Sequence, residues 1–275
     1  MVLGKALLRL LYPESILVRL EEVARTIAVR PQCAVVAGSG WGGYGEEGVE
    51  MVLSFSDLHP ALRVGVLGHQ GIFRFVRWKE KTFLFVEGRM HLYEGYGLSE
   101  ILLPLAFGYF LGVRVVVLTN AAGSLSPFLP PGNILVLSDQ IDWTFVPDAL
   151  PRVRFDEELQ EIALACARRF GLEAVRGVYV GVLGPSFETA AEVRMLEYLG
   201  GHAVGMSTVK EAKFAMGLGL KVLGLSLITN WGTGLSPFPL SHDEVLSLAE
   251  LKRPVLHAFL RELVVGIPYE DCCES

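Results

Sequence analysis

Short runs of β-branched and apolar residues alternate along this chain with longer segments of helical periodicity, and this alternation constrains the fold more than any other feature. It is typical of an α/β protein whose mostly parallel sheet is covered by helices. Strands are expected at 33–37, 63–67, 72–76, 82–86, 114–118, 134–137, 177–182, 202–205 and 222–228. Helices are expected at 14–28, 99–111, 156–170, 188–199, 208–218 and 242–265.

So many expected strands make a flat open sheet improbable, because sheets of that size usually curl or split. We therefore expect a large, twisted, mostly parallel or mixed central sheet that is partly barrel-like and flanked by helices. A length of 275 residues suits a single domain over 1–275. The 51% of hydrophobic residues against 20% charged supplies ample apolar surface for its core.

Charge and hydropathy exclude several classes of partner. A net charge of −6 argues against a nucleic-acid binder, which would gather Lys and Arg to displace counterions. The apolar stretch 101–118 is broken by Pro104 and Arg114, so a buried helix followed by a buried strand explains it better than a membrane span. The N-terminal segment lacks the apolar core of a signal peptide, and we expect a cytoplasmic protein with no membrane partner.

The cysteines give no sign of a metal site or a disulfide scaffold. Cys33, Cys166, Cys272 and Cys273 lack zinc-finger spacing and are too few for a disulfide-rich fold. We expect no bound metal.

Two segments could bind an oxyanion. The glycine-rich GSGWGGYG at 38–45 offers backbone amides and the Ser39 hydroxyl, although glycine-rich loops are more often simple turns. The segment EGRMHLYEGY at 87–96 places Arg89, His91 and Tyr93 at alternate positions, so an extended chain would point them to one face. A solvated strand edge, with Glu87 and Glu94 neutralising Arg89, is the competing interpretation.

Other polar residues have plain structural explanations. In GPSFETAAEV at 184–193, Ser186 could be an N-cap with Glu188 in the first helical turn. In VGMSTVKEAKFA at 204–215, the sulfur-bearing Met206 could belong to the core and Ser207 or Thr208 could cap a helix.

Two similar segments of the sequence suggest two walls of a single site. The segment LTNAAGSLSPF at 118–128 resembles ITNWGTGLSPF at 228–238, and both follow a buried strand. Ligands of α/β sheets bind beyond the carboxyl ends of strands. Thr, Asn and Gly are also ordinary turn residues, so each copy alone is equally well explained by a turn.

Seven motifs in one order resemble the trimeric purine nucleoside phosphorylases over about residues 30 to 250. They are GSG at 38, GRMHLYEGY at 88, LTNAAGSL at 118, GPSFETAAE at 184, VGMSTVKEA at 204, SLITNWGTG at 226 and SHDEVL at 241. The resemblance implies phosphorolysis of purine nucleosides, with inosine or guanosine preferred, to free base and ribose 1-phosphate. It implies inorganic phosphate as co-substrate and no metal or organic cofactor.

The resemblance also assigns site residues. Those implied for phosphate are Ser39, His69, Arg89, His91, Asn120, the backbone of Ala121, and Ser207. Those implied for ribose are Tyr93, Met206 and His242, and those for the purine are Phe187, Glu188 and Asn230. Glu188, Asn230 and His91 are expected to take part in catalysis. His242, which precedes an expected helix, would otherwise be read as a surface residue.

A homotrimer is implied as well, with an aromatic side chain reaching the neighbouring subunit's site from DQIDWTFVPDA at 139–149. Phe145 is the expected residue, and Trp143 is close enough to compete because this segment is shorter than the family pattern. The segment between Val49 and Ala61 does not show the family's proline-bearing phosphate loop clearly.

Three other functions compete with this interpretation. Methylthioadenosine phosphorylase is a related enzyme, but it usually carries acidic residues where this chain has Asn230. A nucleoside hydrolase would leave Arg89 and His91 without an anion to hold. A non-catalytic sensor of purines or phosphate would not need every substrate-contacting position to be filled.

Overall fold

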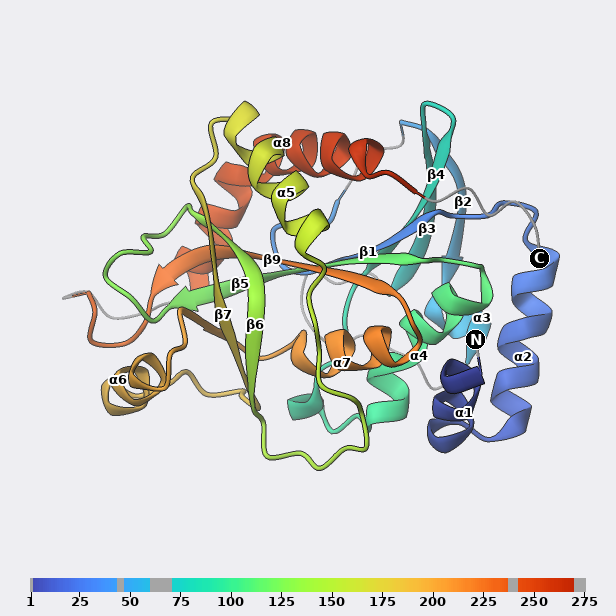
Figure 1. Ribbon diagram of the computed structural model, residues 1–275, viewed down its shortest axis with the longest axis horizontal. Helices are drawn as coiled ribbons and strands as arrows, with labels where there is room; N and C mark the ends of the chain where they lie inside the picture. Colours follow the sequence, from blue (N-terminus) through green and yellow to red (C-terminus); the bar gives the residue numbers. More distant parts are fainter. Residues whose placement is uncertain (1, 44–46, 60–70, 237–241, 270–275) are drawn as a thin grey trace.

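The strands form one mixed sheet in the computed structural model, which describes residues 2–43, 47–59, 71–236 and 242–269 (Figure 1). The strands are β1 (Cys33–Ala37), β2 (Val49–Ser54), β3 (Ile72–Trp78), β4 (Lys81–Glu87), β5 (Val115–Ser124), β6 (Ile134–Trp143), β7 (Ala174–Val182), β8 (Ala203–Gly205) and β9 (Lys221–Trp231). Their order in the sheet is β2-β3-β4-β1-β5-β8-β7-β6-β9.

The sheet closes on itself around β9. This strand pairs in parallel with β5 from Val115↔Lys221 to Ser124↔Trp231 and antiparallel with β6 through Leu135↔Ser226 and its neighbours. Because β5 is also joined to β6 through β8 and β7, these strands make a closed ring, and β1 to β4 extend from it as an open sheet. The expected α/β class with a partly barrel-like mixed sheet is confirmed.

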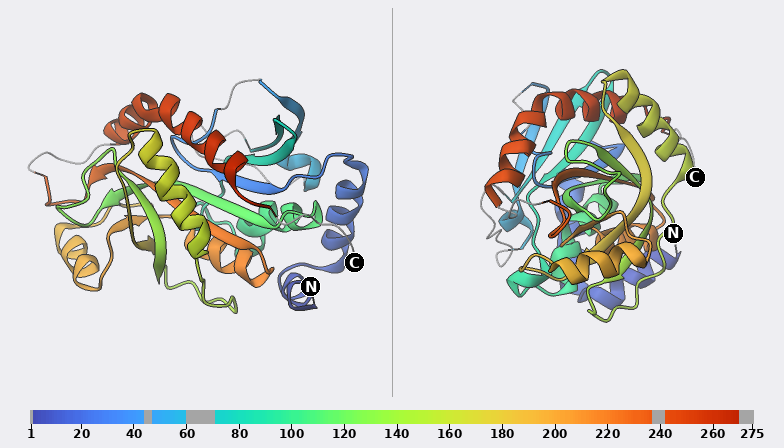
Figure 2. Two further views of the ribbon diagram at one scale, coloured as in Figure 1. Left: turned by 45° about the horizontal axis from the view of Figure 1, so that its top comes forward. Right: turned by 90° about the vertical axis from the view of Figure 1, so that its left-hand side faces the viewer.

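Helices cover both faces of this sheet (Figures 1 and 2). They are α1 (Val2–Leu11), α2 (Glu14–Thr26), α3 (Phe55–Leu58), the 3-10 turn η1 (Leu92–Glu94), α4 (Leu98–Phe110), α5 (Glu157–Arg169), α6 (Ala190–Tyr198), α7 (Val209–Gly217) and α8 (His242–Gly266). Helices α5 and α8 pack on one face, and α1, α2, α4 and α7 pack on the other.

Strand β1 explains how the two cores form. All five of its residues are buried, and successive side chains of a strand point to opposite faces. Ala34 and Val36 accordingly join the core beneath α1, α2, α4 and α7, whereas Cys33, Val35 and Ala37 join the core beneath α5 and α8. A strand with helices on both sides therefore needs the continuous apolar run that the sequence displays.

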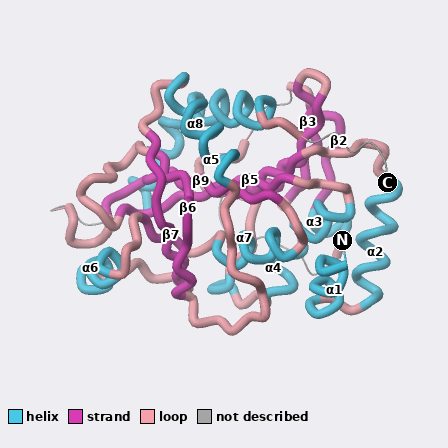
Figure 3. Tube along the Cα trace, in the orientation of Figure 1, coloured by secondary structure: helices cyan, strands magenta, loops and turns pink. Residues whose placement is uncertain are grey.

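The apolar stretch 101–118 is a helix followed by a strand, as expected: α4 ends at Phe110 and β5 begins at Val115. In the described part of the chain, no helix combines the length and apolar character that crossing a membrane requires. Figure 3 shows the alternation of helix and strand along the trace. Helix α1, strand β2 and the short α3 were not predicted, and the strand expected at 63–67 lies outside the described residues.

The start of α6 corrects one expectation. Thr189, not Ser186, is its N-cap: the Thr189 side chain accepts a hydrogen bond from the Glu192 amide, and the Glu192 carboxylate accepts one from the Thr189 amide. This capping box satisfies two amides that the helix itself leaves free. Glu188 therefore lies before the helix, and the first-turn explanation for its carboxylate is wrong.

Ring closure generates a prediction at Gly224 of β9. A Cβ there would lie 2.7 Å from Cδ2 and 2.9 Å from Cβ of Leu137 on β6. Gly224→Ala should therefore lower the free energy of unfolding by about 1–3 kcal/mol, as overpacking does elsewhere. Gly266→Ala is the control, since a Cβ there meets nothing within 4 Å. Equal urea midpoints for the two variants would contradict the tight β6–β9 contact.

Candidate active site

A cavity of about 380 Å³ opens where several strands end. Its walls come from residues that follow β1, β4, β7 and β8 and from the last residues of β5 and β9. Ligands of α/β sheets commonly bind at such carboxyl edges. The residues expected from sequence that line it are Ser39, Arg89, His91, Tyr93, Asn120, Ala121, Phe187, Glu188, Met206, Ser207 and Asn230.

The guanidinium of Arg89 is fixed at one end of this cavity. Its Nε donates to Oε1 of Glu211 at 2.9 Å, and its Nη1 donates to the Thr119 carbonyl at 3.1 Å and to Ser207 Oγ at 3.3 Å. Both partners of the ion pair are buried, with 4% and 7% of their side chains exposed. A buried charge pair with further hydrogen bonds holds a fixed geometry, because losing either partner would leave an uncompensated charge.

The competing interpretation, in which Glu87 and Glu94 neutralise Arg89, fails because both carboxylates bind other residues. Glu87 pairs with Arg74 at 2.9 Å, and Glu94 accepts hydrogen bonds from the backbone amide and ring Nδ1 of His91 at 2.9 and 3.0 Å. Glu211, the actual partner of Arg89, was missed. The pattern Ser-Thr-Val-Lys-Glu does carry a signal for it, because a Glu three residues after a Thr is typical of a capping box.

The residues that precede α7 bring further polar groups beside Arg89. The Thr208 amide donates to Oε2 of Glu211 at 2.8 Å, and Nδ2 of Asn120 donates to the Thr208 hydroxyl at 2.9 Å. Thr208 itself has φ 76° and ψ −46°, the strained conformation of a γ-turn, in which the Val209 amide donates to the Ser207 carbonyl at 2.9 Å. Such a conformation persists only where surrounding contacts fix it, and here they bring Ser207 beside Arg89.

Gly38, the first residue after β1, lies where a side chain would not fit. A Cβ at this position would lie 2.5 Å from the Thr119 carbonyl oxygen and 3.0 Å from Nη1 of Arg89. Only glycine allows the backbone to pass this close. The loop is anchored by Nε1 of Trp41, which donates to the Asn120 carbonyl at 2.9 Å. The Ser39 hydroxyl is thereby carried to the Arg89 end of the cavity.

His91 and Tyr93 both line the cavity, but not because they alternate along an extended strand, as was expected. The extended backbone of β4 ends at Glu87, and Leu92–Glu94 is a 3-10 turn, so alternation along a strand does not align these residues. Their rings stack with centroids 4.8 Å apart. Gly184 makes room for the next wall, because a Cβ there would lie 2.4 Å from Sδ of Met206 and 3.2 Å from Cδ1 of Tyr93.

Asn230 has a defined amide orientation at the other end of the cavity. The Thr229 hydroxyl donates to its Oδ1 at 2.9 Å, and its Nδ2 donates to the Trp231 carbonyl at 3.0 Å. The reverse orientation would place the amide oxygen against that carbonyl oxygen, so the network selects this one. One N–H of Asn230 remains to donate to a bound molecule.

Phe187 and Glu188 complete this end of the cavity. The Phe187 ring is 45% exposed. Burial raises the pKa of the Glu188 carboxyl above its ordinary value. An aromatic face, a carboxyl group and an amide around one space suit a planar heterocycle with polar edges.

Of the three remaining expected site residues, only Phe145 has a described side chain. His69 lies outside the described residues, and of His242 only the backbone is described, at the start of α8. Phe145 is 76% exposed and lies against Trp143 with ring centroids 4.9 Å apart. Neither aromatic ring lines the cavity of its own chain.

The chain is similar to known proteins over nearly its whole length. A family model described as the phosphorylase superfamily matches residues 32–265. Purine nucleoside phosphorylase 1 of Geobacillus stearothermophilus is 34% identical over 248 residues, covering 85% of this chain and 90% of that protein. Purine nucleoside phosphorylase of Mus musculus is 34% identical over 265 residues, covering 88% of this chain and 91% of that protein.

The fold is also similar to that of a solved purine nucleoside phosphorylase. Schistosoma mansoni purine nucleoside phosphorylase in complex with inosine has a TM-score of 0.83 and 26% sequence identity, covering 94% of this chain and 98% of that chain. The family match runs from β1 to α8 and so includes every described segment that lines the cavity. The chain therefore belongs to the purine nucleoside phosphorylases of the phosphorylase superfamily.

Proposed function

We propose that this protein is an enzyme that cleaves purine nucleosides with inorganic phosphate and releases the free base and ribose 1-phosphate. One observation carries the proposal: a single cavity joins a cationic end at Arg89 to a polar end at Glu188 and Asn230. The names of the relatives agree with it. The reaction requires phosphate as co-substrate and no metal or organic cofactor. A cytoplasmic location stays a prediction.

At the cationic end, Arg89 would hold phosphate through its planar fork of donors. Ser39, His91, Asn120, the Ala121 backbone and Ser207 surround the same space, and the resemblance adds His69. Glu94 contacts Nδ1 of the His91 imidazole at 3.0 Å and so orients this ring beside the anion site. Holding the nucleophile in line with the reacting carbon lowers the entropic part of the barrier.

The ribose would lie between the two ends, against Tyr93 and Met206, with His242 assigned to its 5′-hydroxyl by the resemblance. Phosphate oxygen attacks the anomeric carbon while the glycosidic C–N bond breaks. The bonding pair leaves with the purine, the sugar becomes cation-like, and the base takes up the proton that hydrogen phosphate loses in forming the ester. Protein groups accelerate the reaction when they bind this charge distribution more tightly than they bind the substrate.

Asn230 and Glu188 would provide that binding on the purine. The remaining N–H of Asn230 can donate to the ring nitrogen that gains charge as the base departs. The Glu188 carboxylate can accept the ring N–H that a 6-oxopurine presents, whereas adenine presents a lone pair there. Phe187 would pack on the face of the base. We therefore propose inosine or guanosine as preferred substrates.

The first test concerns phosphate. The wild-type protein should cleave inosine only when phosphate is present, and Arg89→Gln should lower kcat/KM for phosphate on the order of 10²-fold, as other losses of an oxyanion donor do. Gln retains a donor that can face Glu211 but removes the cationic fork. Arg77→Gln is the control, because Arg77 pairs with Glu50 on the surface. Phosphate-independent cleavage would eliminate the proposal.

The second test concerns the choice of base. Asn230→Asp replaces a donor with an acceptor, so the ratio of kcat/KM for inosine to that for adenosine should fall about tenfold to a hundredfold, the range for a mismatched buried hydrogen bond. Asn133→Asp adds the same charge outside the cavity and should leave the ratio unchanged. A wild-type preference for adenosine would show that the base pocket is misassigned.

The third test concerns assembly. We propose a closed homotrimer in which Phe145 reaches the neighbouring site, since symmetric closure is usual for soluble homo-oligomers and this ring is 76% exposed. Light scattering should give the trimer mass. Phe145→Ala should raise the nucleoside KM about threefold to tenfold, as expected for one lost aromatic contact. Tyr198→Ala, which removes another exposed aromatic ring, is the control. A fully active monomer would rule the trimer out.

A further inference from the structure

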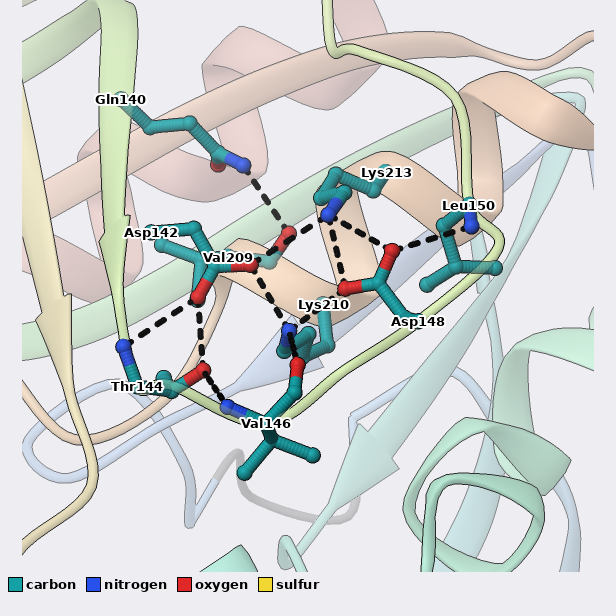
Figure 4. A network of polar contacts seen from close by, with 9 residues as sticks. All are labelled: Gln140, Asp142, Thr144, Val146, Asp148, Leu150, Val209, Lys210 and Lys213. Atoms are coloured by element: carbon teal, nitrogen blue, oxygen red, sulfur yellow. Dashed lines mark hydrogen bonds and ion pairs between the residues drawn. The ribbon is translucent and has the colours of Figure 1, made fainter.

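Two carboxylates and two ammonium groups form a closed network between the end of β6 and α7 (Figure 4). Lys210 contacts Asp142 at 2.8 Å and also donates to Asp148. Lys213 contacts both oxygens of Asp148 at 2.7 Å and lies 3.3 Å from Asp142. Each lysine therefore bridges both aspartates, and the four charges cancel.

Burial makes this network unlike an ordinary surface ion pair. The side chains are exposed by 4% for Lys210 and 20% for Asp142, and by 16% for Lys213 and 5% for Asp148. Burial by itself raises the pKa of Asp148, but hydrogen bonds from Lys210 and Lys213 outweigh it and hold that pKa below its ordinary value. Buried ion pairs add little stability compared with apolar side chains of similar volume, so a fixed geometry is the better explanation for this one.

Lys210 also occupies an unfavourable place in its helix. It lies in the first turn of α7, where the helix dipole favours negative charge, and Lys213 lies nearly one turn further along. Asp142 and Asp148 supply that negative charge from outside the helix. The segment that carries these aspartates is therefore bound to the start of α7 in one register, and Nζ of Lys210 also donates to the Val146 carbonyl at 2.6 Å.

The start of α7 also lies beside the candidate phosphate site, because Ser207 and Thr208 directly precede this helix. Gln140 on β6 donates to the Val209 carbonyl at 3.0 Å, one residue after Thr208. Thr144, whose hydroxyl donates to Asp142 at 2.7 Å, lines a small cavity together with Arg89 and Ser207. Lys210 lines the same small cavity, so the charged network directly adjoins Arg89 and Ser207.

Phe145 lies inside the bound segment. Its φ of 55° is a left-handed conformation that an aromatic residue adopts only when neighbouring contacts fix it. The residue after Phe145 is bound on both its backbone groups: the Val146 amide donates to the Thr144 hydroxyl at 3.3 Å, and its carbonyl accepts from Lys210 at 2.6 Å (Figure 4). One network therefore fixes both this aromatic segment and the turn that carries Ser207.

We propose that Asp142, Asp148, Lys210 and Lys213 act together as positioning residues for the phosphate site. They hold the first turn of α7, and through Glu211 and Ser207 they set the place of the Arg89 guanidinium. The inference rests on the proposed phosphorolysis. None of the four residues touches the substrate in this scheme, so their effect is on the alignment of phosphate and not on a chemical step.

Lys213→Met tests the inference, because methionine keeps an unbranched side chain that reaches as far as the lysine Cε and removes the charge. The phosphate KM should rise about threefold to thirtyfold, the range of coupling through a contact network. Lys213→Arg restores the charge and should recover most of the wild-type phosphate KM. Lys221→Met is the matched control, since Lys221 forms a looser surface pair with Glu158 at 3.7 Å.

A second readout does not depend on catalysis. Phosphate should raise the melting temperature of the wild-type protein, and this shift should shrink in Lys213→Met and in Asp148→Asn but not in the Lys221 variant. A merely structural role would lower the melting temperature without phosphate and leave the phosphate KM unchanged. An unchanged phosphate KM and an unchanged shift, or no recovery with arginine, would overturn the inference. Absence of phosphate-dependent cleavage in the wild type would instead refute the proposed function.

Discussion

The double pairing of β9 is the constraint on which the rest of the structure depends. Because β9 pairs with both β5 and β6, the sheet closes into a ring, and closure removes two exposed strand edges. It also brings the end of β9 beside the end of β5, where Gly123 is the partner of Asn230. A Cβ at Gly123 would lie 3.0 Å from Nδ2 of Asn230, so glycine on one strand makes room for the amide on the other.

Buried ion pairs are the second constraint on the structure. Arg89 is balanced by Glu211, and the neighbouring lysines of α7 are balanced by Asp142 and Asp148. Charges removed from water remain ionised only with partners in good geometry, so each pair also fixes the backbone that carries it. The start of α7 is consequently held by several buried ion pairs, and Thr208, which precedes it, has a positive φ.

Sequence patterns predicted the apolar elements well and the edge elements poorly. Strand β1 and helices α4, α5 and α8 follow continuous or strongly periodic apolar runs, and their bounds agree with expectation within a few residues. Strand β2 alternates between exposed and half-buried residues because it forms an edge of the sheet, so no apolar run marks it. The two similar Thr-Asn segments do line one cavity, as expected, but their asparagines are not paired with each other: Asn120 is the partner of Ser226 and Asn230 the partner of Gly123.

The sequence by itself determined the α/β class, the two-sided burial of the central strands and the kinds of side chain available for an anion and a planar base. Only the tertiary structure decided which groups meet: Glu211 with Arg89, Glu94 with His91, and Thr229 with the Asn230 amide. The burial and periodicity of an element depend on residues that are close together in the sequence, whereas the partner of Arg89 lies 122 residues away. Such a partner follows from ring closure and packing, which no local pattern encodes.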